Sequence, residues 1–319
     1  MGIMGAGLAT ALAEVLSCFL LLRVVFKMQG ERMYSLIKWP KPHQLKRFLG
    51  FAGPIFFALL GKVVCYSAMT TTVSLCGPLP LATHQVMLRV FFFFATLGES
   101  LSQTAQAFLP GLEQKEEQAV TAAATAAALG GKPPRKIKTP GQRMIRKIMG
   151  MGVVVGVLNA MAAGLVPTHM SGLFTNDARV AAAMKGLVPL LSWSLVTHAC
   201  VMALEGILLA KRQLSYLART YAVNTVLMLG FMRLVSSWGP ERGLHGAWMG
   251  LVLLQVIRFV QFGAQLLWVK RGERRAARET AIRAVQAVDA TRHAAATTAA
   301  AAATGLADSG QPLANVAPA

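Results

Sequence analysis

Seven long apolar segments dominate this sequence and limit the folds that it can adopt. They cover residues 2–25, 48–76, 81–109, 148–170, 180–210, 214–236 and 244–269. Each is at least as long as the roughly 20 residues that an α-helix needs to cross a hydrocarbon layer about 30 Å thick. We therefore predict an all-α membrane protein with seven transmembrane helices, whose apolar surface faces lipid.

The composition supports a lipid bilayer as the main partner. Charged residues make up 14% of the chain and hydrophobic residues 55%, whereas a soluble domain carries about 25% charged residues. The net charge of +19 could indicate a nucleic-acid partner, but the Lys and Arg residues are spread over alternate connections and do not form one stripe. We expect no nucleic-acid partner.

The connections between the apolar segments alternate in charge. Basic residues concentrate after the first, third, fifth and seventh segments, while the connection at 77–80 carries no charge. Basic loops stay on the cytosolic side of a membrane or its equivalent. This pattern predicts an outside amino terminus and an inside carboxyl terminus. The first segment lacks a basic leader and is long, which favours a spanning helix over a signal peptide.

Two polar regions interrupt this pattern on the inner side. Residues 111–147 are Ala-rich and then contain Gly-Gly-Lys-Pro-Pro at 130–134, which predicts a flexible loop. Residues 271–319 begin with Arg and continue with Ala and Thr. We expect a tail that can begin as a helix and ends disordered.

The third segment carries a polar stripe at helical spacing. Its members share one face that only Phe92 interrupts, and they are Gln85, Arg89, Thr96, Glu99, Gln103 and Gln106. Polar and ionisable groups at bilayer depth are costly unless they are paired or face water. The stripe predicts a helix that lines a water-filled cavity; a buried network that holds helices together is the alternative.

Two further segments carry ionisable residues. His198 and Glu205 lie two turns apart on one face, and Glu205 could bind a proton or a cation. Alternatively, Glu205 could pair only with Lys211 or Arg212 at the inner end of its helix. In the second segment, Lys62 could neutralise Glu99 or Glu205, or attract an anionic substrate.

Other polar and helix-breaking residues complete the expected pathway. Tyr66 follows Lys62 by one helical turn, and Pro54 and Pro189 are expected to kink their helices. Gln255 and Arg258 in the last segment are expected to pair or to reach the membrane surface. The sequence has no phosphate-binding loop, catalytic triad or metal-ligand spacing. We therefore expect no enzyme activity, no metal and no cofactor.

Four stretches resemble the multidrug and toxic compound extrusion (MATE) family. They are FAGPIFFALLGKVVCYS (51–67), LATHQVMLRVFFFFATLGESLSQTAQAFLPG (81–111), LEGILLAKRQLSYL (204–217) and GLHGAWMG (243–250). They are most similar to the plant and algal detoxification branch, which is related to the bacterial DNA-damage-inducible protein F. The combination of Gly-Pro, Ala-x-His-Gln and Glu-Gly-x-Leu is more specific than any one of them.

The resemblance implies a domain plan. Family members have two six-helix lobes that face each other across a cleft. On this template residues 1–25 match the last helix of the amino-terminal lobe, 26–47 the cytoplasmic interlobe loop and 48–270 the carboxyl-terminal lobe, with 271–319 as the tail. Helices one to five would be a missing partner, supplied by a longer chain or by a second protein. His198 stands where some branches carry a carboxylate.

The resemblance also implies a function. We expect antiport driven by H⁺ or Na⁺ that exports organic solutes or xenobiotics by alternating access, in the plastid envelope or else in the plasma or vacuolar membrane. A flippase for lipid-linked precursors of the same superfamily is one alternative. A heptahelical receptor is another, although the third and last segments lack the Asp/Glu-Arg-Tyr and Asn-Pro-x-x-Tyr motifs of that class.

Overall fold

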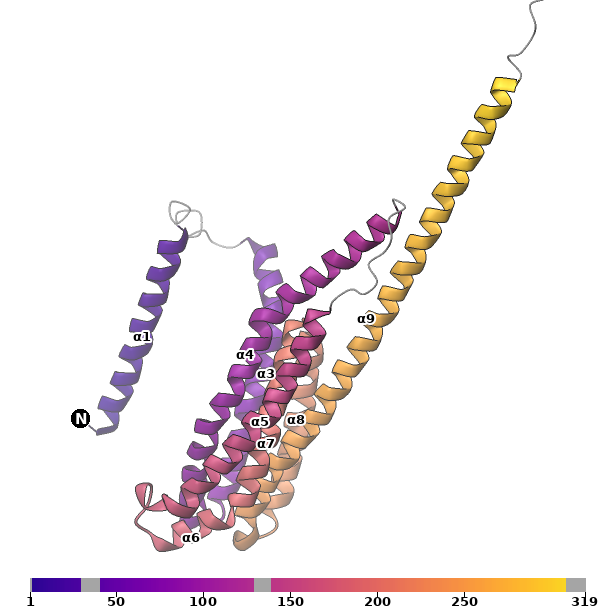
Figure 1. The fold of residues 1–319 in the computed structure, drawn as a ribbon. Helices are drawn as coiled ribbons and strands as arrows, with labels where there is room; N and C mark the ends of the chain where they lie inside the picture. The colour runs from indigo at the N-terminus through magenta and orange to yellow at the C-terminus, as the bar shows by residue number, and fades with distance from the viewer. Residues whose placement is uncertain (1, 30–40, 129–138, 308–319) are drawn as a thin grey trace, which may run out of the picture. The chain divides into compact units, whose positions relative to one another are not determined.

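The computed structural model describes residues 2–29, 41–128 and 139–307, and nearly all of them are helical (Figure 1). The helices are α1 (Gly2–Gln29), α3 (Pro42–Ser74), α4 (Pro78–Ala128), α5 (Pro140–His169), the 3₁₀ helix η2 (Ser171–Leu173), α6 (Ala178–Gly186), α7 (Val188–Ala210), α8 (Leu214–Ser236) and α9 (Pro240–Ala307). The predicted all-α class is confirmed.

The chain divides into two compact units, Met1–Gly53 and Pro54–Ala319. The first unit contains α1 and the beginning of α3. Large apolar side chains along α1 are exposed, for example Leu12 at 61% and Phe19 at 63%. This exposure suits a helix that meets lipid or another helix. The second unit contains the remainder of α3 and all later helices, and every site described below lies within it.

Six of the described helices are long and apolar enough to cross a membrane, namely α1, α3, α4, α5, α7 and α9. The sixth predicted segment, 214–236, forms α8, which has 23 residues. Arg219, Asn224 and Arg233 interrupt its apolar run. The membrane fold is therefore confirmed, although α8 is not among these six helices.

The fifth predicted segment, 180–210, is broken in the structure. α6 ends at Gly186 and α7 begins at Val188, so that Pro189 lies in the first turn of α7. Proline is well tolerated there, because the first-turn amide groups have no partner within the helix. Pro189 therefore starts a helix, and our expectation of a kink inside a helix was wrong. Pro54 does lie inside α3.

Helices extend into residues 111–147, where we expected a flexible loop, and into the tail, which we expected to begin as a helix. α4 continues to Ala128, α5 begins at Pro140, and α9 continues to Ala307. Both extensions are rich in Ala, which has the highest intrinsic helix propensity. Residues 30–40 of the predicted interlobe loop, residues 129–138 and the tail end at 308–319 lie outside the described part of the chain.

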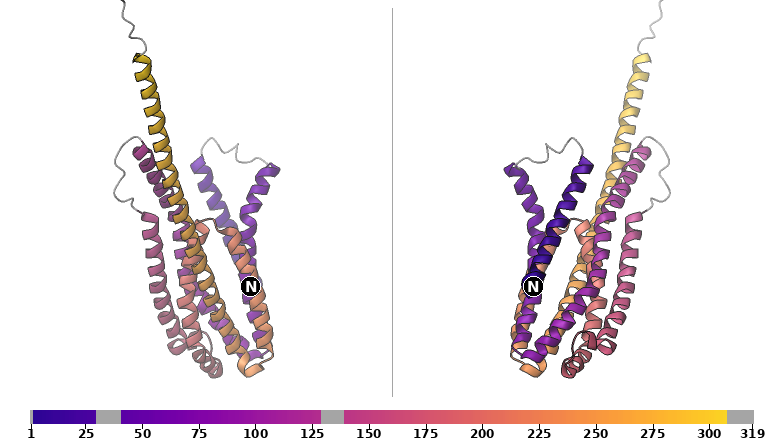
Figure 2. Two further views of the ribbon diagram at one scale, coloured as in Figure 1. Left: turned by 90° about the vertical axis from the view of Figure 1, so that its right-hand side faces the viewer. Right: turned by 90° about the vertical axis from the view of Figure 1, so that its left-hand side faces the viewer.

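α7 forms the centre of the second unit. Every residue of α7 from His198 to Leu208 is buried, and α4, α5 and α9 pack around this helix. Figure 2 shows α3 and α8 side by side, and a Cβ atom added to Gly61 of α3 would lie 2.7 Å from the Thr225 hydroxyl of α8. The second half of α7 has no exposed side, which explains why this segment can carry a carboxylate.

Glycine allows a close contact between α7 and α4. A Cβ atom on Gly206 of α7 would lie 2.6 Å from the carbonyl oxygen of Ser102 in α4. Small residues permit such close backbone approach in membrane helix pairs. The contact fixes the position of α7 next to Glu205.

Candidate functional site

A buried network of charged and polar side chains connects four helices of the second unit. At its centre is Glu205 of α7, whose Oε1 atom lies 2.8 Å from Nζ of Lys62 in α3. Its Oε2 atom accepts hydrogen bonds from Nη2 of Arg258 in α9 at 2.8 Å and from the hydroxyl of Tyr221 in α8 at 2.6 Å. Arg258 also donates to the Tyr221 hydroxyl. Both carboxylate oxygens of Glu205 are thus occupied by partners from within the chain.

The network continues from Arg258 towards His198. Nη1 of Arg258 donates to Oε1 of Gln255 at 3.2 Å, and the Gln255 amide nitrogen lies 2.7 Å from Nδ1 of His198. The His198 ring also contacts Phe91, with 5.4 Å between centroids. His198 is therefore a buried hydrogen-bonding residue connected to Glu205 through α9.

The network lies between two apolar clusters. On α4 and α9, the first cluster reaches Ala95 and Leu251, and the second resumes at Leu101 and Phe262. With two cations and one carboxylate, the network retains a surplus positive charge. Buried ions are costly to desolvate, and breaking such a pair is more costly still. The arrangement holds charge at a fixed depth and joins α3, α7, α8 and α9.

The structure decides between two earlier expectations for Glu205. The carboxylate does not pair with Lys211 or Arg212; its partners are Lys62 and Arg258. Lys62 lies against Glu205, as one alternative held. The side chain of Lys62 is 25% exposed and that of Arg258 only 5%. Lys62 is therefore the partner of Glu205 that is more accessible to water.

Gln255 and Arg258 were expected to pair or to reach the membrane surface, and both pair in the buried network. The contributions of α8 and of the rest of the polar stripe on α9 were not predicted from the sequence. Tyr221 and Asn224 lie one turn apart on α8, and Asn224 exchanges two amide hydrogen bonds with Gln261 of α9, at 2.8 and 3.1 Å. Gln255, Arg258, Gln261 and Gln265 recur at spacings of three and four residues. The test applied to the third apolar segment would have found this stripe as well.

The polar stripe of α4 lies elsewhere, on the outside of the second unit. Gln85 is half-buried, while Arg89, Thr96, Glu99, Gln103 and Gln106 are exposed. Tyr66 of α3 is half-buried and stacks edge-on against Phe92 in the middle of this stripe, with 4.9 Å between ring centroids. The predicted site residues therefore separate into a buried group of Lys62, His198 and Glu205, and an exposed group on α4.

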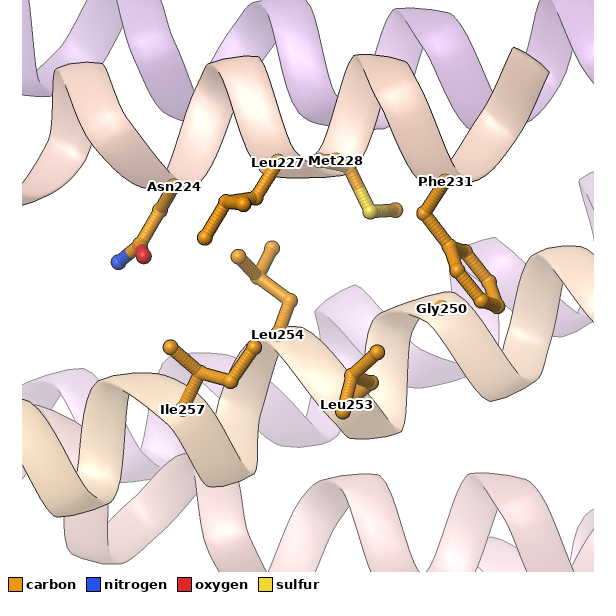
Figure 3. Close-up of a pocket in the computed structure, with 8 residues that line it drawn as sticks. All are labelled: Asn224, Leu227, Met228, Phe231, Gly250, Leu253, Leu254 and Ile257. Carbon is orange, nitrogen blue, oxygen red and sulfur yellow. The ribbon is translucent and has the colours of Figure 1, made fainter. Parts of the chain in front are cut away.

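Inside this unit, α8 and α9 enclose a small apolar pocket (Figure 3). Its volume is about 20 Å³, and Asn224 is the single polar residue among those that line it. Pockets for organic solutes measure about 300–1,000 Å³. This pocket is too small for such a solute.

A second ionic cluster ties the helices together just beyond the inner end of α7. Nζ of Lys211 binds Oε1 of Glu113 in α4 and, at 2.7 Å, Oε1 of Glu273 in α9. Near it, the backbone amide of Gly141 at the start of α5 donates to Glu116 at 2.7 Å. Desolvation lowers the pKa of Lys211, but its hydrogen bonds to the two carboxylates outweigh this effect and the net pKa is raised.

Comparison with known proteins identifies relatives of this chain. Protein DETOXIFICATION 47, chloroplastic, of Arabidopsis thaliana is 27% identical over 83% of this chain and 45% of its own length. Protein DETOXIFICATION 44, chloroplastic, of the same plant is 24% identical over 85% of this chain and 47% of its own length. No family model and no solved structure matches the sequence.

The chain spans about half the length of the curated relatives that it matches. These similarities extend over more than 80% of the chain. They agree with a bundle of apolar helices that carries charged groups in its interior. Over most of its length, this chain is similar to the chloroplastic DETOXIFICATION proteins of Arabidopsis thaliana.

Proposed function

We propose that this chain acts as the carboxyl-terminal lobe of a secondary transporter that exports organic solutes by alternating access, driven by H⁺ or Na⁺. The single observation that carries the proposal is the exposed polar stripe on α4, from Arg89 to Gln106. A membrane helix cannot present such a face to acyl chains without a large free-energy cost. A water-filled cleft between this lobe and an amino-terminal lobe removes that cost.

In this proposal Glu99 and Gln103 meet solute and ion first, because both side chains are exposed on α4. Glu205 lies in the buried network and would bind the ion at a later step. Its carboxylate already has Lys62 and Arg258 as counterions, so a gradient cation can reach it only if Lys62 moves away. Movement of Lys62 between Glu205 and the cleft would then connect ion binding to the position of α3.

The relatives that carry "chloroplastic" in their names support the plastid envelope as the location of this chain. A fluorescent fusion of the chain that accumulates in the plasma or vacuolar membrane, with none in the plastid envelope, would contradict this location.

The test of transport is gradient-driven efflux of ethidium from vesicles that contain this chain joined to an amino-terminal lobe. We expect Glu99→Gln to reduce efflux strongly and Glu205→Gln to alter its dependence on H⁺ or Na⁺. Glu117→Gln is the matched control, because Glu117 is also an exposed acid of α4 but lies beyond the stripe. Unchanged efflux and unchanged ion dependence in the Glu99 and Glu205 double variant would refute the proposed roles.

The same vesicles can separate transport from the flippase alternative. A flippase for lipid-linked precursors would move a labelled lipid between leaflets and leave ethidium efflux at background. We expect the reverse, because Arg89 is the one cation of the α4 stripe, and a large anionic cargo needs more positive charge than one side chain supplies.

A further inference from the structure

A polar groove lies where α8 begins, next to the last spanning turns of α9. Its volume is about 450 Å³, and its lining includes Arg212, Gln213, Tyr216, Arg219, Gln265 and Trp268. The candidate span on α9 ends at Glu273, and that on α7 ends at Ala210. The groove is therefore at the level of the membrane surface, on the side of the basic connections.

Two arginines give this groove its charge. Arg212 and Arg219 are both exposed, and within the described part of the chain neither guanidinium forms a salt bridge with a carboxylate. Arg219 uses its Nε atom to donate to the carbonyl of Ser215 at 3.2 Å. The planar donor geometry of a guanidinium group suits phosphate and sulfate oxygens.

The backbone holds Arg212 in a conformation that favours glycine. The amide of Arg212 donates to the carbonyl of Leu209, and that of Gln213 donates to Leu208, each at 2.9 Å. This pair of bonds closes α7 in a Schellman motif, whose left-handed position is usually glycine. Arg212 occupies that position with φ of 57°. An arginine at a site where glycine costs less is a reason to look for a role of its side chain.

The groove opens towards lipid as well as towards water. Trp268 is 68% exposed and its neighbour Leu267 is 60% exposed. Tryptophan is enriched at membrane interfaces, where its ring packs among headgroups. A soluble phosphate compound would have no use for this apolar border, whereas a phospholipid would place its acyl chains along it.

We propose that this groove binds the anionic headgroup of a membrane lipid from the leaflet on the basic side. The phosphate or sulfate group lies between the Arg212 and Arg219 guanidinium groups. The Gln213 and Gln265 side chains, which are hydrogen-bonded to each other at 3.2 Å, border the headgroup. Trp268 flanks the first carbons of the lipid. The site does not depend on the transport function proposed above.

The experiment counts the lipids retained by the detergent-purified chain in native mass spectrometry. The probes are phosphatidylglycerol and phosphatidylcholine, presented in equal amounts. We expect the unaltered chain to retain phosphatidylglycerol in preference, and the double variant Arg212→Gly with Arg219→Gln to lose this preference by roughly tenfold. Arg212→Gly relieves the left-handed strain, so this substitution should not destabilise the fold.

The control variant is Arg143→Gln with Arg146→Gln, which removes the same charge from exposed positions at the start of α5. We expect its preference to change less than about threefold, because only diffuse attraction is lost. An equal loss in both double variants would overturn the proposal, since no specific site would then exist.

Two further arms test the lipid itself. Glycerol 3-phosphate at millimolar concentration should leave lipid retention unchanged; displacement of the lipid by this soluble ester would overturn the assignment to a lipid. Trp268→Ala should weaken phosphatidylglycerol retention while the far-ultraviolet circular dichroism of the helices stays the same. Undiminished retention in this variant would overturn the role of the apolar border.

Discussion

The chain carries charged side chains at membrane depth in two regions that treat them differently. In the interior, Glu205 is buried with Lys62 and Arg258 as partners, and both carboxylate oxygens are occupied. On the outside of the same lobe, Arg89 and Glu99 lie exposed on α4. The charged side chains of the interior group are paired with one another. The exposed group needs water or a partner surface to compensate its charges.

This difference predicts that the interior network mainly stabilises the fold and that the α4 stripe mainly contributes to the proposed transport. The interior network joins four helices, so its loss should mainly reduce stability. The stripe on α4 borders no comparable partners, so its loss should mainly reduce transport. The Lys211 cluster is an intermediate case, since Lys211 is 6% exposed while its partners Glu113 and Glu273 are 31% and 51% exposed.

The largest effect should come from Glu205→Gln. The substitution leaves Lys62 and Arg258 facing each other without a counterion, which we expect to cost about 3–5 kcal/mol of unfolding free energy. Thermal unfolding in detergent measures it. Adding Lys62→Met to Glu205→Gln should recover part of the loss, because one buried cation is removed. A loss of unfolding free energy below about 1 kcal/mol would mean that the interior network contributes no more to stability than exposed charges do.

Gly206→Ala should have the next largest effect. The added methyl group would meet the backbone of Ser102, and overpacking of this kind costs about 1–3 kcal/mol. Gly150→Ala is the control, because a Cβ atom there meets nothing within 4 Å. Equal stability of the two variants would contradict the close contact between α4 and α7 beside Glu205.

Lys211→Gln should cost about 1 kcal/mol at neutral pH, because both carboxylate partners are partly open to water. The pKa of Lys211 is raised in the folded state from 10.5. Its contribution is therefore complete below pH 10.5 and is lost as the pH rises through the raised value. The stability difference between the unaltered chain and the variant should shrink in that alkaline range, and a constant difference would exclude the ionic role.

The smallest effect on stability should come from Gln103→Ala on the stripe. We expect a change within about 0.5 kcal/mol, as for most exposed positions, together with reduced ethidium efflux from vesicles. If Gln103→Ala lowered stability strongly but left ethidium efflux normal, the proposed difference in role between the stripe and the interior network would be wrong.

Much of the fold could be predicted from the sequence, because lipid imposes a simple rule. A spanning segment must satisfy its own backbone hydrogen bonds and present apolar side chains over about 20 residues. The apolar runs therefore determined the helical class, whereas the orientation inferred from the alternating basic connections stays a prediction. The break at Gly186–Val188 was missed because apolarity continues through it, although Pro189 marked the start of α7.

The partners of the charged residues were decided only by the tertiary structure. Glu205 has two basic neighbours in sequence, Lys211 and Arg212, yet it binds Lys62 and Arg258, which are 143 and 53 residues away. Helical spacing states which side chains share a face, but it does not state which helix that face meets. Packing of α7 at the centre of the second unit turned Glu205 inwards and left the stripe of α4 outside.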